Sequence, residues 1–150
     1  MKSSGGNDGV HDRLDSYGVY LLARQLFDEF WEDSEMLARD FRGQELARQQ
    51  VCSLDSVCAN IEEGYGRGYG KELPQHLKIS RGEARESKGR YQRCSRLLPS
   101  VIQARTATLD RIIGGLTKTI VTIGNRRTVQ DARLASRHPS PVTRHPSRFQ

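Results

Sequence analysis

The chain has 150 residues, 35% of them hydrophobic, which suits one domain with a modest core and flanking tails. It has no secretory signal at its start, no apolar stretch long enough to span a bilayer and no CxxC pair among its three cysteines, so we expect a cytoplasmic protein without disulfides, membrane contact or a zinc knuckle. The net charge of +6 is uneven: residues 1–63 carry 6 Lys/Arg against 13 Asp/Glu, and residues 64–150 carry 18 against 5, which is typical of a nucleic-acid surface or of acidic-to-basic contact between subunits.

Four segments show the apolar spacing of helices, and none alternates as a strand would. They span 17–33, 43–63, 71–98 and 100–123. Residues 1–16 are polar and glycine-rich and residues 124–150 are rich in arginine, so both ends are predicted to be disordered tails, the second one basic. Four helices with short connections predict an all-α fold, an antiparallel up-and-down four-helix bundle over residues 17–123.

The first predicted helix buries Leu22, Leu26 and Phe30 and becomes acidic toward its C-terminal end. The second has an apolar face and, beside it, a stripe of uncharged small or amide side chains. This stripe comprises Gln49, Ser53, Ser56 and Asn60, and Glu63 and Gly64 follow it. Such side chains form hydrogen bonds between helices or between subunits, or they line a ligand site, and we favour the first role.

Glycines at every second position mark the segment NIEEGYGRGYGKE, residues 60–72. A Walker loop would need glycine at position 65 and a hydroxyl at 72, but Tyr65 and Glu72 stand there. The dinucleotide-binding spacing also fails, and no strand precedes the segment. We therefore predict a hinge between two helices, with a phosphate contact by Arg67 as an open hypothesis.

The third predicted helix separates its charges by sign around the helix axis. Its basic flank comprises Lys71, Lys78, Arg81, Arg85, Lys88 and Arg96, and its glutamates fall on the other flank. A basic stripe of nearly four turns is a candidate phosphate-tracking surface. The alternatives are a solvated helix face or pairing with the acidic first helix.

The fourth predicted helix contains Gly114-Gly115, which costs about 1 kcal/mol per residue relative to alanine. Close approach of another backbone would offset that cost, and a weak point in the helix is the other explanation.

Catalytic chemistry is not indicated. A di-iron bundle needs Glu-x-x-His pairs, and the chain has none. His76 is the one histidine outside the predicted tails, with no local motif to position it as a catalytic base. We expect no enzymatic activity, no metal and no cofactor.

The stretch QQVCSLDSVCANIEEGYGR, residues 49–67, resembles a motif of the four-helix-bundle proteins first known from open reading frames in intervening sequences of bacterial 23S ribosomal RNA genes. KEL at 71–73, GEARES at 82–87 and IIGGLTKTI at 112–120 are similar to the later helices of that family. The likeness covers residues 17–123. Glu62, Pro74 and Glu83 depart from the pattern of the family.

The resemblance implies a bundle that assembles as a ring-shaped homopentamer without established enzymatic activity. A related group acts as accessory proteins of diversity-generating retroelements, in which a basic pentamer is implicated in binding nucleic acid and the reverse transcriptase. We therefore expect a bacterial protein that binds RNA or DNA, with a reverse transcriptase as a candidate partner. The rival expectation is a protein-interaction ring that binds no nucleic acid.

Overall fold

The computed structural model describes residues 13–68 and 70–137 of the chain. After a short 3-10 turn, Arg13–Ser16, four α-helices follow: α1, Gly18–Leu37; α2, Phe41–Gly66; α3, Glu72–Gln92; and α4, Pro99–Arg137. The described residues contain no strand, which confirms the predicted all-α class.

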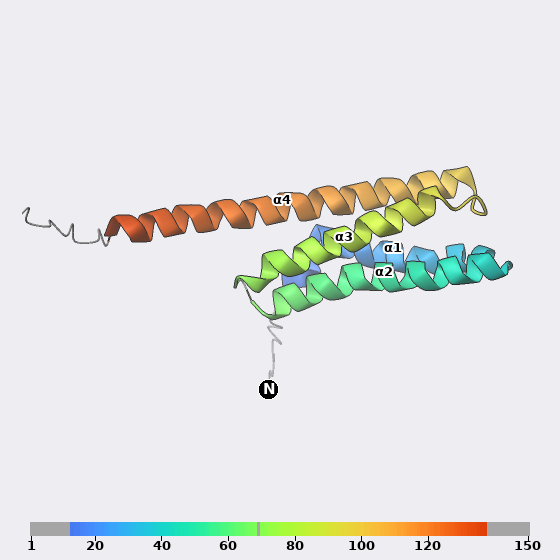
Figure 1. Ribbon diagram of the computed structural model, residues 1–150, viewed down its shortest axis with the longest axis horizontal. Coiled ribbons are helices and arrows are strands. Elements are labelled where there is room, and N and C mark those ends of the chain that lie inside the picture. The colour runs from blue at the N-terminus through green and yellow to red at the C-terminus, as the bar shows by residue number, and fades with distance from the viewer. Residues whose placement is uncertain (1–12, 69, 138–150) are drawn as a thin grey trace, which may run out of the picture.

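Successive helices run in opposite directions and pack side by side, and α1 also packs against α4, which closes the bundle (Figure 1). The core lies between them, at the positions that the apolar spacing selected. Leu26 of α1, Ile61 of α2, Leu77 of α3 and Leu116 of α4 are all fully buried. Burial of one such side chain contributes about 1.5–3 kcal/mol, so this apolar core is what holds the four helices together.

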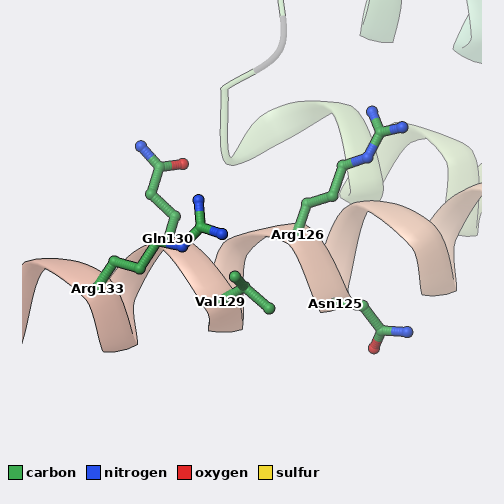
Figure 2. A pocket seen from close by; sticks show the side chains of 5 residues that line it. All are labelled: Asn125, Arg126, Val129, Gln130 and Arg133. Atoms are coloured by element: carbon green, nitrogen blue, oxygen red, sulfur yellow. The ribbon is translucent and has the colours of Figure 1, made fainter.

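The largest difference from the predicted boundaries is the length of α4, which runs to Arg137 instead of ending at 123. The prediction that residues 124–150 are a disordered tail is therefore wrong for 124–137, while 138–150 and 1–12 lie outside the described residues. A polar helix carries no apolar stripe, so its sequence shows no periodic signal. The end of α4 extends past the other helices in Figure 1, and Figure 2 shows five of its side chains.

The connection between α3 and α4 is longer than predicted, because α3 ends at Gln92 instead of 98. Pro99 is the first residue of α4, where the missing amide hydrogen costs no helical hydrogen bond. Leu98 precedes this proline, and a residue in that position disfavours helical backbone angles, so Leu98 lies outside α4.

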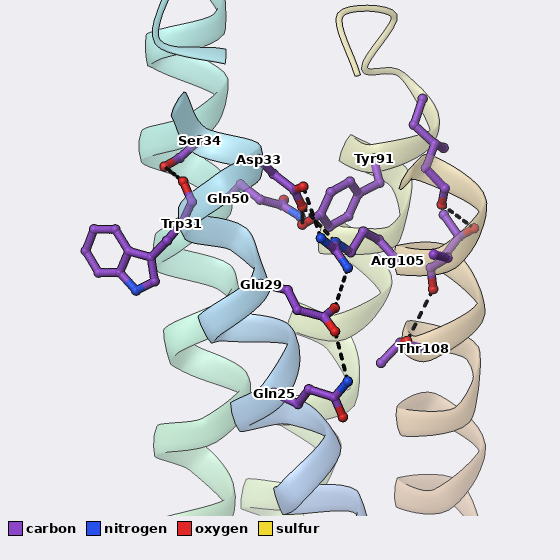
Figure 3. Close-up of polar contacts among 12 residues, drawn as sticks. Gln25, Glu29, Trp31, Asp33, Ser34, Gln50, Tyr91, Arg105 and Thr108 are labelled. Atoms are coloured by element: carbon purple, nitrogen blue, oxygen red, sulfur yellow. Dashed lines mark hydrogen bonds and ion pairs between the residues drawn. The ribbon is translucent and has the colours of Figure 1, made fainter. Parts of the chain in front are cut away.

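A polar network that the sequence analysis missed joins three helices near the C-terminal end of α1 (Figure 3). Arg105 of α4 donates to both carboxylate oxygens of Asp33, at 2.9 and 3.2 Å, and also pairs with Glu29. The Tyr91 hydroxyl of α3 donates to Asp33 Oδ2 at 2.8 Å. Asp33 is only 4% exposed. Two of the acids near the C-terminal end of α1, Glu29 and Asp33, are thus paired with a cation of α4 and not with the basic flank of α3.

Of the adjacent glycines Gly114 and Gly115 in α4, one is required by the packing. A Cβ at Gly115 would lie 2.3 Å from Val19 Cγ2 of α1, whereas a Cβ at Gly114 would meet nothing within 4 Å. The expected close approach of another backbone is therefore not found: a valine side chain occupies the space beside Gly115, and nothing lies close to Gly114.

Candidate nucleic-acid interface

The glycine-rich segment is a turn, and it is shorter than the sequence suggested. The α2 helix continues through Gly64 and Gly66, and Gly68 adopts a positive φ of 81°, which favours glycine. Gly64 is a buried residue of α2 that lies against α3. A Cβ at this position would lie 3.0 Å from side-chain atoms of both Leu73 and His76. This glycine thus serves the close packing of α2 on α3.

Arg67, the open candidate in this turn, is held by two carboxylates. Its guanidinium pairs with Glu63 and, at 3.2 Å, with Glu72. The hydrogen bonds to these two carboxylates raise the pKa of Arg67. A phosphate would have to displace both carboxylates, so the pairing weakens the case for Arg67 as a phosphate contact.

The two flanks of α3 face different neighbours. On the basic flank, Arg81 donates to Thr117 of α4 at 3.2 Å, and Lys88 pairs with Asp110 of α4 at 2.6 Å. On the opposite side, Arg90 pairs with Glu86 on α3 itself and donates to Ser53 of α2 at 2.6 Å. The basic flank therefore lies along α4.

Three of the seven cations predicted to bind nucleic acid are already paired with carboxylates. Besides Arg67 and Lys88, Arg96 lies 3.7 Å from Asp40. Arg42 hydrogen-bonds the same Asp40 and holds the pKa of its carboxyl well below the usual range, so that this carboxylate stays charged. Such pairs leave little net positive charge for a phosphate.

The other four predicted cations form what we call the α3 basic face: Lys71, Lys78, Arg81 and Arg85. Within the described residues, no carboxylate pairs with any of them. Lys71, Lys78 and Arg85 are exposed, and Arg81 is half-buried against α4. At 1.5 Å per residue the face extends about 21 Å along α3.

The predicted packing stripe of α2 is divided between an interior and an exterior role. Ser53 accepts from Arg90, and Asn60 Oδ1 lies 3.3 Å from His76 Nδ1, so both contact α3. Ser56 is half-buried, and its carbonyl accepts from Asn60 Nδ2 at 2.9 Å. Gln49 and Glu63 are exposed, where they contact Glu45 and Arg67 of the same helix region.

Gln50 is a buried polar residue of α2 that lies outside the predicted stripe. It is 2% exposed, and its amide nitrogen donates to Ser87 Oγ at 2.6 Å. A second buried hydrogen bond joins the same two helices: Ser80 Oγ of α3 donates to the Val57 carbonyl of α2 at 2.9 Å. Buried hydrogen bonds thus fix the register of α2 against α3.

The described residues offer few groups for other chemistry. Burial raises the pKa of the Cys58 thiol to about 12, so it is protonated at neutral pH. Cys94 is buried as well, and Cys52 is exposed. No group of three or more potential metal ligands occurs among residues 13–68 and 70–137. In that same part of the chain, no helix is long and apolar enough to cross a bilayer.

An apolar hollow of about 270 Å³ lies between α1 and α2, away from the α3 basic face. Phe27, Phe30 and Trp31 line it from α1, and Ala47 and Val51 line it from α2. Trp31 is 64% exposed, which is unusual for so large an apolar side chain.

Comparison with known proteins gives a family match. No curated protein and no solved structure matches the chain. The family model of the 23S rRNA-intervening sequence proteins matches residues 15–108, which cover α1, α2, α3 and the start of α4. The match covers more than half of the chain and includes most of the core and the whole α3 basic face. The chain is therefore a member of the 23S rRNA-intervening sequence protein family.

Proposed function

We propose that this protein is a non-enzymatic nucleic-acid-binding protein that contacts phosphates without reading sequence. The observation that carries the proposal is the α3 basic face, four cations on one flank of a helix that no carboxylate of the described residues neutralises. The family description names ribosomal RNA, which supports an RNA-associated role and makes RNA the first substrate to test.

The physical basis is the release of counterions. Each phosphate neutralised by lysine or arginine frees condensed cations, so the binding constant falls steeply as salt rises. Side chains on one face of a rigid helix reach backbone phosphates but carry no information about the bases. The α3 basic face therefore fits sequence-independent binding.

Neutralising the α3 basic face is expected to weaken binding. The variant Lys78→Gln, Arg81→Gln, Arg85→Gln should bind labelled RNA about tenfold or more weakly, with a salt slope lower by about one for each lost contact. Fluorescence anisotropy across a salt series measures both quantities. The matched control, Arg24→Gln, Arg39→Gln, Arg48→Gln, removes the same charge from exposed positions on α1, on the α1–α2 connection and on α2.

The control is expected to keep most of the affinity. Equal weakening of both variants would show that only overall charge matters and would remove the α3 basic face from the account. Absence of binding by the unaltered chain to RNA, duplex DNA and single strands would favour the rival function, a protein-interaction scaffold.

We also propose that the protein assembles with copies of itself, and the resemblance of its sequence makes a pentamer the expected size. The apolar hollow with the exposed Trp31 supports self-association, because exposed apolar patches mark interaction surfaces. Light scattering after gel filtration should give a mass five times that of the chain, and Trp31→Glu should lower it. A monomer at high protein concentration would refute this proposal.

A further inference from the structure

The last turns of α4 lie beyond the reach of the other described helices. Opposite α3, the contacts Arg81–Thr117 and Lys88–Asp110 share one antiparallel register, which places the first residue of α3, Glu72, opposite position 126. The hydrogen bond between Tyr17 and Thr119 places the start of α1 opposite position 119 of α4, which comes before position 126 in the chain. Residues 126–137 therefore run outward from the level of the start of α3, past the other described helices. We call them the α4 arm (Figure 1).

The α4 arm lacks the residues of a helix that packs into a core. The core face of α4 passes through Leu116, Ile120 and Ile123, and the next positions on that face are Arg127 and Gln130. Leu134 and Val129 are about half exposed, at 52% and 51%. The arm thus has a mostly polar surface on which these two apolar side chains are exposed.

Arginines dominate that surface. The arm carries four arginines against one acid, Asp131. Arg126, Arg133 and Arg137, together with Gln130, follow the spacing i, i+4, i+7, i+11 and so share one face. No carboxylate of residues 13–68 and 70–137 pairs with these three arginines. They are exposed, and the arm is about 18 Å long at 1.5 Å per residue.

This arginine face is turned toward the end of the bundle. Figure 2 shows Arg126, Gln130 and Arg133 on the side of α4 where the neighbouring ribbon lies. A hollow of about 580 Å³ runs along them, lined also by Asn125 and Val129. All five lining residues belong to α4, so the hollow lies along the arm itself and its cations are open to a ligand.

We propose that the α4 arm is a second phosphate-binding element, which holds the backbone of a double-helical nucleic acid while the α3 basic face contacts it elsewhere. The proposal rests on the proposed function and adds to it a substrate class. A rigid row of arginines can contact the regularly spaced phosphates of a duplex. Each guanidinium can form bidentate hydrogen bonds with one phosphate. The arm contains no aromatic side chain on which bases of a single strand would stack. The family match ends at residue 108, so the arm is a feature outside the matched region.

The test compares the full chain with the variant Arg126→Gln, Arg133→Gln, Arg137→Gln. Probes are an RNA duplex, a DNA duplex of the same sequence and one separated strand, each titrated by fluorescence anisotropy across a salt series. We expect about tenfold weaker duplex binding and a salt slope lower by two to three, about one for each lost phosphate contact. Single-strand binding should change much less. The two duplexes show whether A-form or B-form geometry is preferred.

The variants of the α3 basic face and of α1 and α2 serve as comparisons. If the arm variant binds duplexes as the unaltered chain does while the α3 variant fails, the arm proposal is wrong and the proposed function stands. If the unaltered chain binds no probe, both are wrong. If the arm variant changes only the mass of the assembly, the arm contacts an acidic surface of another subunit, and the proposal is also overturned. Circular dichroism confirms that each variant retains its helices.

Discussion

Replacing Arg105 by methionine is expected to lower the free energy of unfolding by about 3–5 kcal/mol, because the substitution leaves the Asp33 carboxylate buried without its cation. Asp33 is 4% exposed, and the Arg105 guanidinium reaches both of its oxygens. The hydrogen bonds from Arg105 to Asp33 raise the pKa of Arg105, so it remains charged throughout the accessible pH range. Urea unfolding followed by circular dichroism at matched protein concentration measures the loss.

A compensated variant is the control for that loss. Asp33→Leu, Arg105→Met, Tyr91→Phe removes the charge pair together with the hydroxyl that would otherwise lose its acceptor. The ring contact between Phe30 and residue 91, with centroids 6.4 Å apart, can persist in the phenylalanine variant. Replacing all members of a buried polar group by apolar ones is often nearly neutral, so this variant should be more stable than Arg105→Met alone. A loss of less than about 1 kcal/mol for Arg105→Met would contradict the stabilising role of this network.

Replacing Gly43 by alanine is expected to destabilise the protein by at least about 2 kcal/mol, which is large for the addition of one methyl group. A Cβ at this position would lie 2.0 Å from the carbonyl oxygen of Leu37 and 2.9 Å from its carbonyl carbon. Both contacts are with backbone atoms, so no rotamer change relieves them. The α1–α2 connection itself would have to move.

Gly82→Ala is the matched control for Gly43→Ala. Gly82 lies inside α3, and a Cβ there would meet nothing within 4 Å. Alanine should therefore stabilise the helix, by about 0.4–1 kcal/mol, because it restricts the unfolded chain without strain. Thermal unfolding of the two variants should give opposite shifts of Tm. Equal shifts would contradict the assignment of Gly43 to a tight backbone contact.

The helices could be predicted from the sequence because apolar spacing reports directly which face is buried. Leu26 and Phe30 each lie at an expected core position, and both are buried. The end of α4 could not be predicted, because a helix without an apolar face leaves no periodic signal. Its continuation to Arg137 is visible only in the structure.

The ion pairs between helices also could not be predicted from the sequence. The sequence places Lys88 and Lys78 on one flank of a helix, but only the register of α3 on α4 brings Asp110 to Lys88. Arg96 and Asp40 are far apart in the chain and meet at one end of the bundle. The basic surface predicted from the sequence therefore includes cations that pair with carboxylates in the folded chain.

The glycine-rich segment connects two helices as predicted, but the boundary between α2 and the turn was predicted wrongly. Gly64 belongs to α2 and lies against Leu73 and His76. Glycine in a sequence indicates either a turn or a close contact, and the pattern alone does not distinguish the two.

A salt titration of RNA binding by the unaltered chain shows whether this bundle binds phosphates. If the α3 basic face and the α4 arm both contact phosphates, the logarithm of the binding constant should fall with the logarithm of salt concentration with a slope of about −4 or steeper. A nearly flat slope, or no binding at low salt, would contradict a phosphate-binding role for this bundle.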